Sequence, residues 1–252
     1  MTEPIISARN VSRHFGGVKA VQDVSLDIRA GQRVGFIGPN GAGKSTFVNC
    51  LAGGLPPSSG DVLVDGRSIT RLSSQARSRL GIARTFQNLE LFLSMTAFEN
   101  VLVAIDGTTN RRSALRPGRA RDARVKAMDG LAMLGIEAYA DVPTGALPYG
   151  VRKLVELSRA FVTEPRVLLL DEPVAGLSDT DEFLDVLSAG IDRLGCGVLL
   201  VEHDMPTVRR LCEVVHVLEG GRLIASGTYE EVARDPHVID AYLGTHHEPS
   251  TP

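Results

Sequence analysis

The feature that most constrains the fold is the segment at residues 38–45, which reads GPNGAGKS and is followed by Thr46. It satisfies the phosphate-loop template G-x-x-x-x-G-K-[ST] at every fixed position. Glycines let the backbone curl so that successive N–H groups point inward, and a helix starting there offers further unpaired N–H groups to the same anion. An apolar, strand-like run precedes the loop at residues 33–37, and a helix-like run follows at residues 46–52. The segment therefore predicts that the chain binds a nucleotide.

Each position of this loop has a predicted use. Lys44 can reach the β- and γ-phosphates, and the Ser45 hydroxyl can bind Mg²⁺. A glycine-rich turn without a ligand is the alternative, but average residue usage gives odds of about one in a hundred for a chance match in a chain of this size. The predicted nucleotide-binding residues of the loop are Gly38, Pro39, Asn40, Gly41, Ala42, Gly43, Lys44, Ser45 and Thr46.

Composition argues against several classes of protein. The 252 residues are 23% charged with a formal net charge of −3, so no global field favours nucleic acid as a partner. The three cysteines are far apart and lack metal or redox spacing, which predicts reduced core residues. No basic segment leads into a long apolar one at the start, and the apolar runs are too short to cross a bilayer. We therefore expect a cytoplasmic protein without a membrane span.

Two kinds of strand pattern occur along the chain. Alternation with turns predicts a β-meander over residues 5–30, an edge hairpin at residues 61–66 and a hairpin over residues 214–226. Continuous apolar runs at residues 167–170 and 198–201 predict strands buried on both faces, as in a parallel sheet.

Carboxylates and a histidine follow these buried strands. Asp171 and Glu172 come directly after one run, and His203 closes the other after Glu202. Ligands of parallel sheets bind at the carboxyl ends of the strands, so we expect these residues and the phosphate loop to share one sheet edge. A helix is expected over residues 178–194, with Ser178 or Asp179 as its N-cap.

Residues 88–150 are predicted to be mostly helical, with a basic run inside them. A solvated face is the favoured interpretation of that run, and contact with anionic lipid head groups is the alternative. Nucleic acid is disfavoured because no aromatic residues interleave with the cations. The basic residues are Arg111, Arg112, Arg116, Arg119, Arg121, Arg124 and Lys126.

Taken together, these motifs resemble the ATP-binding subunit of an ABC transporter over nearly the whole chain. The loop at residues 38–45 is similar to the first nucleotide motif, and residues 166–171 are similar to the second. Gln87 resembles the glutamine of the Q-loop and His203 the switch histidine. The resemblance places Phe15, with Val18 beside it, where the family stacks an aromatic residue on adenine.

The resemblance implies an α/β fold of the P-loop NTPase (RecA-like) type. It would have a mostly parallel sheet core, an N-terminal antiparallel β subdomain and an inserted helical subdomain. Residues 1–86 and 159–244 would form the core with its β subdomain, residues 87–158 the helical subdomain, and residues 245–252 a flexible tail.

A narrower resemblance is to the ATPase subunits of branched-chain amino acid importers, and among these to the livG type. It is carried by the run RTFQ at residues 84–87, LPYG at residues 147–150, DEPVAGL at residues 171–177 and DPHVIDAYLG at residues 235–244.

The signature motif of the family, LSGGQ, departs from the usual pattern here. Pro148 replaces the serine, Tyr149 the first glycine and Val151 the glutamine, while Gly150 is kept. The resemblance implies that these four residues face the ATP of the opposite subunit. Ser178 also stands where the family has the aspartate of its D-loop.

The resemblance further implies ATP and Mg²⁺ as cofactors and assigns roles. Asp171 would hold the metal together with Ser45 and Gln87, Glu172 would act as general base on the attacking water, and His203 would contact the γ-phosphate. Charge neutralisation and an oriented water are what phosphoryl transfer requires.

The implied partners are a second ABC ATPase, two transmembrane permeases and, indirectly, a substrate-binding protein. The altered signature favours a heterodimer over a homodimer, at the inner face of the cell membrane. The apolar stretch after Gln87 would supply the permease contact through Leu91, Phe92 and Met95, with about half of its apolar side chains buried inside the subdomain.

Other functions fit the sequence less well. A soluble ABC ATPase in repair, translation or cofactor assembly is the runner-up, and a nucleotide-sensing module is conceivable if the altered signature abolishes turnover. A P-loop GTPase would need an Asn-Lys-x-Asp motif, which the sequence lacks, and a small-molecule kinase would leave residues 147–150 and His203 without a role.

Overall fold

The computed structural model describes residues 3–85, 89–108 and 118–243. The chain forms two compact units, one made of residues 1–77 and 197–252 and the other of residues 78–196. Among the described residues, no helix combines the length and the apolar character needed to cross a membrane.

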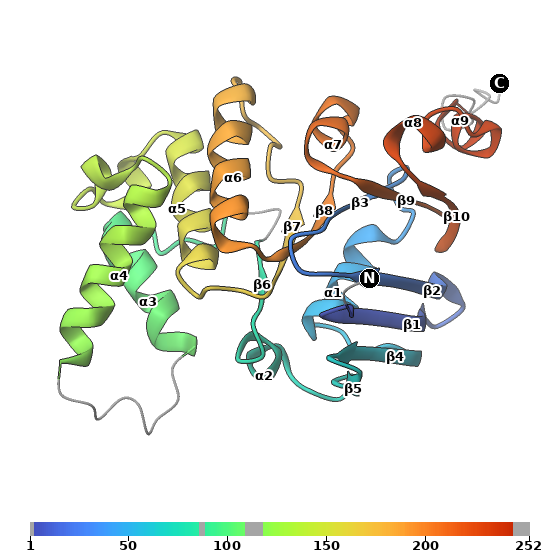
Figure 1. Ribbon diagram of the computed structural model, residues 1–252, viewed down its shortest axis with the longest axis horizontal. Coiled ribbons are helices and arrows are strands. Elements are labelled where there is room, and N and C mark those ends of the chain that lie inside the picture. The colour runs from blue at the N-terminus through green and yellow to red at the C-terminus, as the bar shows by residue number, and fades with distance from the viewer. Residues whose placement is uncertain (1–2, 86–88, 109–117, 244–252) are drawn as a thin grey trace. The chain divides into compact units, whose positions relative to one another are not determined.

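The first unit contains an antiparallel sheet of strand order β2-β1-β4-β5 (Figure 1). β1 pairs with β2 and with β4, and the β4–β5 hairpin closes one edge. The predicted meander and edge hairpin are therefore confirmed, with two long strands in place of the three short segments read from the sequence. The bounds are β1 Ile6–Phe15, β2 Val18–Ile28, β4 Ser59–Val64 and β5 Arg67–Ser68.

A second set of strands in this unit has the order β10-β9-β3-β8. β3 is parallel to both β8 and β9, and β10 is antiparallel to β9, which confirms the hairpin predicted over residues 214–226. All five residues of β8 are buried, as a continuous apolar strand requires. The bounds are β3 Arg33–Ile37, β8 Gly197–Val201, β9 Val214–Glu219 and β10 Arg222–Gly227.

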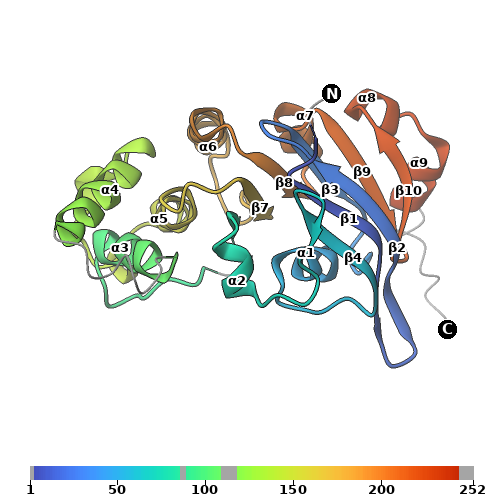
Figure 2. The same ribbon diagram turned by 60° about the horizontal axis from the view of Figure 1, so that its bottom comes forward.

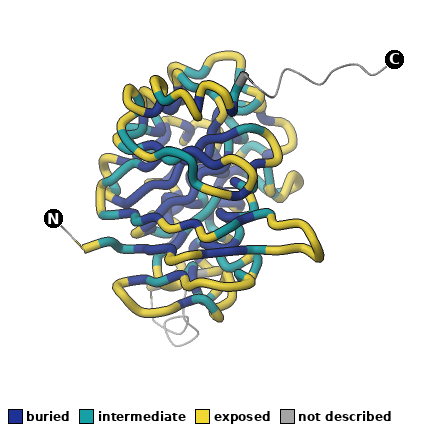
Figure 3. Tube along the Cα trace, turned by 90° about the vertical axis from the view of Figure 1, so that its right-hand side faces the viewer, coloured by how far each residue is buried: buried dark blue, intermediate teal, exposed yellow. Residues whose placement is uncertain are grey.

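Helices pack on these strands. α1 lies against β1 and β2 (Figure 2), and a cluster built on Ile37, Val208, Val215 and Val217 joins α7, α8 and α9 to β9. The bounds are α1 Lys44–Ala52, α2 Ser74–Ser78, α7 Met205–Leu211, α8 Tyr229–Val232 and α9 Pro236–Leu243. In both units the buried stretches of chain follow the strands and the inner sides of the helices, while turns are exposed (Figure 3).

The second unit combines two parallel strands with helices. β6 pairs with β7 in parallel, and α3, α4 and α5 contact one another as a helical layer. The predicted helical subdomain, residues 87–158, falls inside this unit, and its boundaries stay a prediction. The bounds are β6 Ile82–Arg84, α3 Ala97–Thr108, α4 Arg119–Met133, α5 Tyr149–Phe161, β7 Val167–Asp171 and α6 Asp181–Leu194, with short 3-10 helices at Glu137–Tyr139 and Thr144–Ala146.

One local expectation was wrong. The helix expected from residue 178 begins at Asp181, with Thr180 rather than Ser178 or Asp179 at the N-cap. The Asp179 carboxylate instead accepts a hydrogen bond from the backbone N–H of Asp181, an Asx-type turn that competes with an earlier helix start.

The three cysteines behave as expected. All are free, Cys50 and Cys196 are buried, and Cys212 is partly buried. Burial raises the pKa of the Cys50 thiol to about 11 and that of Cys212 to about 12. They are therefore protonated, unreactive core residues.

Candidate nucleotide-binding and catalytic site

The phosphate loop fills the connection between β3 and α1. Gly38, Gly41 and Gly43 have φ values of 149°, 79° and 105°, which favour glycine. A Cβ at Gly38 would lie 2.0 Å from the carbonyl oxygen of Leu218, and one at Gly43 would lie 2.0 Å from that of Ala20. Two of the glycines are therefore required both by conformation and by the close approach of neighbouring strands.

The helix that follows is left open at its N-terminus. Gly43 is the N-cap of α1, makes no side-chain cap hydrogen bond, and is followed by no acidic residue in the first turn. The first N–H groups of α1 and its dipole can therefore act on an anion. Ser45 and Thr46 lie in this turn, and Ser45 is exposed.

Lys44 closes the loop on itself. Its side chain is buried, and Nζ donates hydrogen bonds to the carbonyl oxygens of Gly38 at 2.6 Å and Pro39 at 3.0 Å. Asn40 and Gly41 are exposed at the tip of the loop, while Ala42 is buried. The ammonium thus lies within the loop, where a phosphate oxygen would be its partner.

His203 leaves the sheet beside this loop. Phe36 of β3 pairs with Val201 of β8, so both strands end at the same edge. Glu202 is fully buried, whereas the side chain of His203 is 60% exposed. The Glu202 carboxylate accepts a hydrogen bond from the backbone N–H of His203, and the imidazole Nδ1 lies 3.8 Å from it. The turn is thereby fixed while the imidazole faces outward.

The predicted adenine contact lies on the β1–β2 turn. Phe15 is 45% exposed and Val18 is 67% exposed, so both side chains are accessible to a ligand. The guanidinium of Arg13 lies 4.6 Å from the centre of the Phe15 ring. A ring held in this way can stack on a planar base.

Asp171, which is predicted to bind the metal, ends β7 in the second unit. Asp171 is 2% exposed, and its Oδ2 lies 3.0 Å from Nη2 of Arg84 at the end of β6. The backbone N–H of Asp171 also points at the Thr85 hydroxyl, 3.4 Å away. From the sequence, Arg84 was assigned only to the RTFQ motif. Its contact with Asp171 could have been suspected because Arg84 ends β6, the strand that precedes β7 in the chain.

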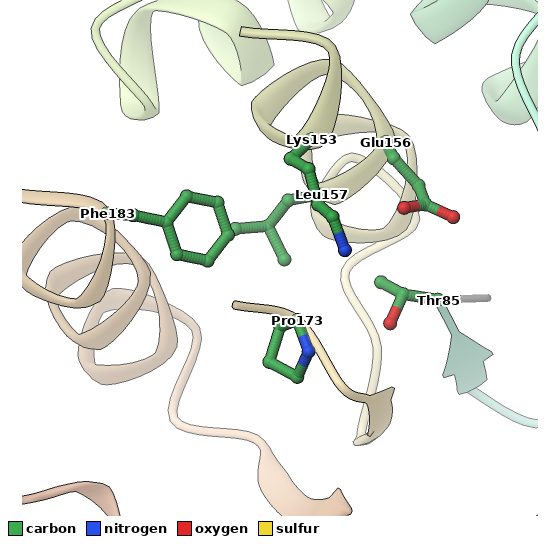
Figure 4. Close-up of a pocket in the computed structure, with 6 residues that line it drawn as sticks. All are labelled: Thr85, Lys153, Glu156, Leu157, Pro173 and Phe183. Atoms are coloured by element: carbon green, nitrogen blue, oxygen red, sulfur yellow. The ribbon is translucent and has the colours of Figure 1, made fainter. Parts of the chain in front are cut away.

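Glu172 directly follows in a left-handed conformation, with a φ of 50°. Such a backbone is uncommon for a residue other than glycine and clusters at functional sites. Its carbonyl oxygen accepts a hydrogen bond from Nζ of Lys153 at 3.3 Å. Lys153, Thr85 and Pro173 line a small pocket together with Glu156, Leu157 and Phe183 (Figure 4).

The altered signature stands at the start of α5. Pro148 is the N-cap and is exposed, while Gly150 and Val151 are partly buried in the first turn. The Tyr149 hydroxyl donates to the carbonyl oxygen of Ala175 at 3.3 Å, and a Cβ on Gly176 would lie 3.1 Å from its ring. The tyrosine that replaces a glycine therefore packs on the loop after β7.

The three residues expected to contact a permease all lie among the described residues, and their exposure differs. Leu91 and Met95 are partly buried, while Phe92 is 48% exposed and Leu93 is 55% exposed. Burial was expected for about half of the six apolar residues at positions 89, 91, 92, 93, 95 and 98. Phe98 is buried, the residues at 89, 91 and 95 are partly buried, and those at 92 and 93 are exposed.

Asn100 fixes this turn, a role that the sequence pattern does not reveal. Buried Asn100 accepts from the Phe92 N–H at 2.9 Å and donates to the Phe92 carbonyl at 3.1 Å. Arg159 lies 5.7 Å from the Phe92 ring centre. The prediction for Gln87 lies outside the described residues, as do Arg111, Arg112 and Arg116 of the basic run.

The two units thus divide the predicted site. The first unit carries the phosphate loop, Phe15, Val18 and His203, and the second carries Asp171, Glu172 and the signature residues. Within the described residues, no group of three or more His, Cys, Asp or Glu side chains is arranged to hold a metal ion. A metal here would need hydroxyl or phosphate oxygens as well as a carboxylate.

A strand–loop–helix of this geometry in a parallel sheet defines a P-loop nucleoside triphosphatase. The family described as ABC transporter matches residues 21–175, and the chain belongs to that family. The family described as branched-chain amino acid ATP-binding cassette transporter matches residues 222–248. The predictions of an ABC-type α/β fold and of an ATPase are confirmed.

Relatives and solved structures agree with this assignment. The chain is 38% identical to the high-affinity branched-chain amino acid transport ATP-binding protein BraF of Pseudomonas aeruginosa, covering 97% of this chain and 99% of BraF. It is 36% identical to the corresponding LivG of Escherichia coli, again covering 97% and 99%. The crystal structure of an ATP-binding cassette of an ABC transporter in its ADP conformation matches with a TM-score of 0.84 and 30% identity, over 96% of this chain and all of that one. A soluble, non-transport ATPase is not favoured.

Proposed function

We propose that this chain is the ATP-hydrolysing subunit of an importer for branched-chain amino acids or related small polar solutes, acting at the inner face of the cell membrane. The observation that supports this most is a complete phosphate loop in a chain that aligns end to end with BraF and LivG. The match over residues 222–248 extends the same likeness to the C-terminal segment.

ATP binding follows from the loop. The N–H groups at the start of α1 and the Lys44 ammonium surround the position of the phosphates, and the Lys44 contacts to Gly38 and Pro39 would be exchanged for phosphate oxygens. Phe15 would stack on adenine, with Val18 beside it.

The residues present fit Mg²⁺. Its preferred ligands are oxygens, and the chain offers the exposed Ser45 hydroxyl and the Asp171 carboxylate, which lies 3.0 Å from Nη2 of Arg84. Bound there with ATP, the ion would neutralise charge that develops on the phosphates. Gln87 would join these residues.

Hydrolysis would then depend on two side chains. Glu172 follows Asp171 directly, so its carboxylate is our candidate for accepting a proton from the attacking water. The outward-facing imidazole of His203 would contact the γ-phosphate.

The working unit would be a pair of ATPases on two permeases, with a substrate-binding protein outside. Pro148, Tyr149, Gly150 and Val151 would face the ATP of the partner ATPase. Because three of these four positions depart from the usual signature, we favour a heterodimer with a second, different ATPase.

The test is hydrolysis and nucleotide binding by Glu172→Gln, with Lys44→Ala beside it, in the importer assembled with its permeases and second ATPase. We expect Glu172→Gln to bind ATP normally and to lose steady-state hydrolysis, because the shape is kept and the base is removed. Lys44→Ala should lose ATP binding itself, since a charge-assisted contact is removed. Hydrolysis by Glu172→Gln within a few-fold of the wild type would show that the base lies elsewhere.

A further inference from the structure

The buried ends of β6 and β7 carry opposite charges. Nη2 of Arg84 and Oδ2 of Asp171 are 3.0 Å apart, with side-chain exposures of 12% and 2%. The parallel register places Arg84 opposite Leu169, so the two side chains meet diagonally at the carboxyl edge of the strands. The pair is therefore fixed by the sheet itself rather than by a flexible loop.

A buried ion pair of this kind affects the stability of the fold. A carboxylate removed from water is costly unless a cation accompanies it, and breaking a buried ion pair by deleting one partner is strongly destabilising. A divalent ion bound at Asp171 would supply positive charge to the same carboxylate. Within the chain, Arg84 supplies positive charge to it from 3.0 Å away.

The geometry leads us to a role for Arg84 that the family assignment does not contain. We propose that Arg84 is a positioning residue for the metal site: it compensates the charge of Asp171 and fixes its carboxylate when no Mg²⁺ is bound. This inference rests on the proposed role of Asp171 in binding the metal. A contribution confined to packing of β6 would not depend on the metal.

The experiment compares the wild type with Arg84→Met by thermal unfolding of the full chain, first with ADP and EDTA and then with saturating Mg²⁺ and ADP. Without the metal, we expect Arg84→Met to lower Tm by about 10 °C, as loss of a buried ion pair would in a chain of this size. With Mg²⁺, the deficit should shrink to less than half, because the metal takes over the missing charge. By linkage, the gain in ADP affinity on adding Mg²⁺ should be about tenfold greater in Arg84→Met than in the wild type.

Three further variants make the result decisive. Arg84→Lys should recover much of the lost Tm, since it keeps the charge. In Arg84→Met with Asp171→Asn, the buried charge is gone, so the double variant should be more stable than Arg84→Met alone and should fold even if that variant does not. Arg9→Met breaks the exposed Arg9–Asp27 pair, 2.7 Å long, and its deficit should be the same with and without Mg²⁺.

The outcomes test the metal role of Asp171 and the positioning role of Arg84 separately. If Asp171→Asn alone leaves the effect of Mg²⁺ on ADP affinity unchanged, the proposed metal role of Asp171 fails. If Asp171→Asn abolishes that effect while the Arg84→Met deficit is independent of the metal, the role of Arg84 is overturned and that of Asp171 stands. The proposed role of Arg84 would also be overturned if the double variant were no more stable than Arg84→Met.

Discussion

The glycines of the phosphate loop allow a quantitative test of how the loop is held. Gly41 and Gly43 lie two residues apart and both have positive φ, 79° and 105°. A Cβ at Gly41 would meet nothing within 4 Å, whereas a Cβ at Gly43 would lie 2.0 Å from the Ala20 carbonyl oxygen in β2. Alanine at these positions therefore separates conformational strain from steric overlap in one loop.

The magnitudes follow from the geometry. Alanine in a left-handed conformation costs about 1–2 kcal/mol, which is all we expect for Gly41→Ala. Gly43→Ala bears the same strain and must also move a backbone carbonyl by more than about 1 Å, and forced overpacking adds about 1–3 kcal/mol. In a chain of this size, about 2–4 °C of Tm corresponds to 1 kcal/mol, so Gly41→Ala should lose about 4 °C and Gly43→Ala about 10 °C.

The assay is thermal or urea unfolding in EDTA without nucleotide, followed by ADP titration calorimetry. We expect Gly43→Ala to bind ADP much more weakly as well, since displacement of the N-cap of α1 misdirects the N–H groups that receive the phosphate. Equal stability of the two variants would refute the close approach of β2 to the loop.

Three further expectations concern other parts of the chain. Phe92→Asp should abolish uptake in the reconstituted importer while ATP binding is retained. Leu72 is an exposed residue of the other unit, and Leu72→Asp should leave uptake intact. Full uptake by Phe92→Asp would show that the permease contact lies elsewhere. Burial lowers the pKa of His216, so the unfolded state takes up the proton first and the protein should become less stable as the pH falls below about 6.5. His216→Gln should reduce this loss, measured as the difference between urea midpoints at pH 7.5 and pH 5.5. Cys50 and Cys212, with pKa values raised to about 11 and about 12, should resist iodoacetamide at pH 8 until the chain is unfolded, and rapid labelling of the native protein would contradict their burial.

The parts of the site that sequence analysis could find are those encoded by local pattern. The phosphate loop combines fixed spacing with a strand before it and a helix after it, and Asp171 and His203 each end a continuous apolar strand. Parallel strands place their carboxyl ends at one edge of the sheet. Polar residues at these ends could therefore be proposed as site residues without knowledge of contacts between distant segments.

The parts that it missed depend on register and on packing between distant segments. The Arg84–Asp171 pair joins residues 87 positions apart, and it exists only because Arg84 pairs opposite Leu169. Asn100 holds the Phe92 turn through its side chain, which no periodicity reveals. The start of α6 was misplaced because Asp179 can stabilise either a helix or a turn, and the turn forms.

The first turn of α5 places two cations against the helix dipole. Arg152 and Lys153 both lie there, and the dipole by itself would favour an anion docked at this end. Lys153 is instead 3% exposed and donates to the carbonyl oxygen of Glu172 at 3.3 Å, so it has an acceptor within the chain. The signature helix and the proposed catalytic base are thereby connected.

That connection makes a prediction which the dipole argument does not. Losing a buried charged hydrogen bond costs about 1.5–3 kcal/mol, so Lys153→Met should lower hydrolysis by about ten- to a hundredfold if the loss falls on the position of Glu172. ATP affinity should change little, because Lys153 lies outside the phosphate loop. Arg152→Met removes a cation from the same turn without touching Glu172 and should have little effect on hydrolysis. The measurement is steady-state hydrolysis and ATP affinity of both variants in the assembled importer. Equal losses in both would mean that the charge of the turn matters, and that the bond to Glu172 does not.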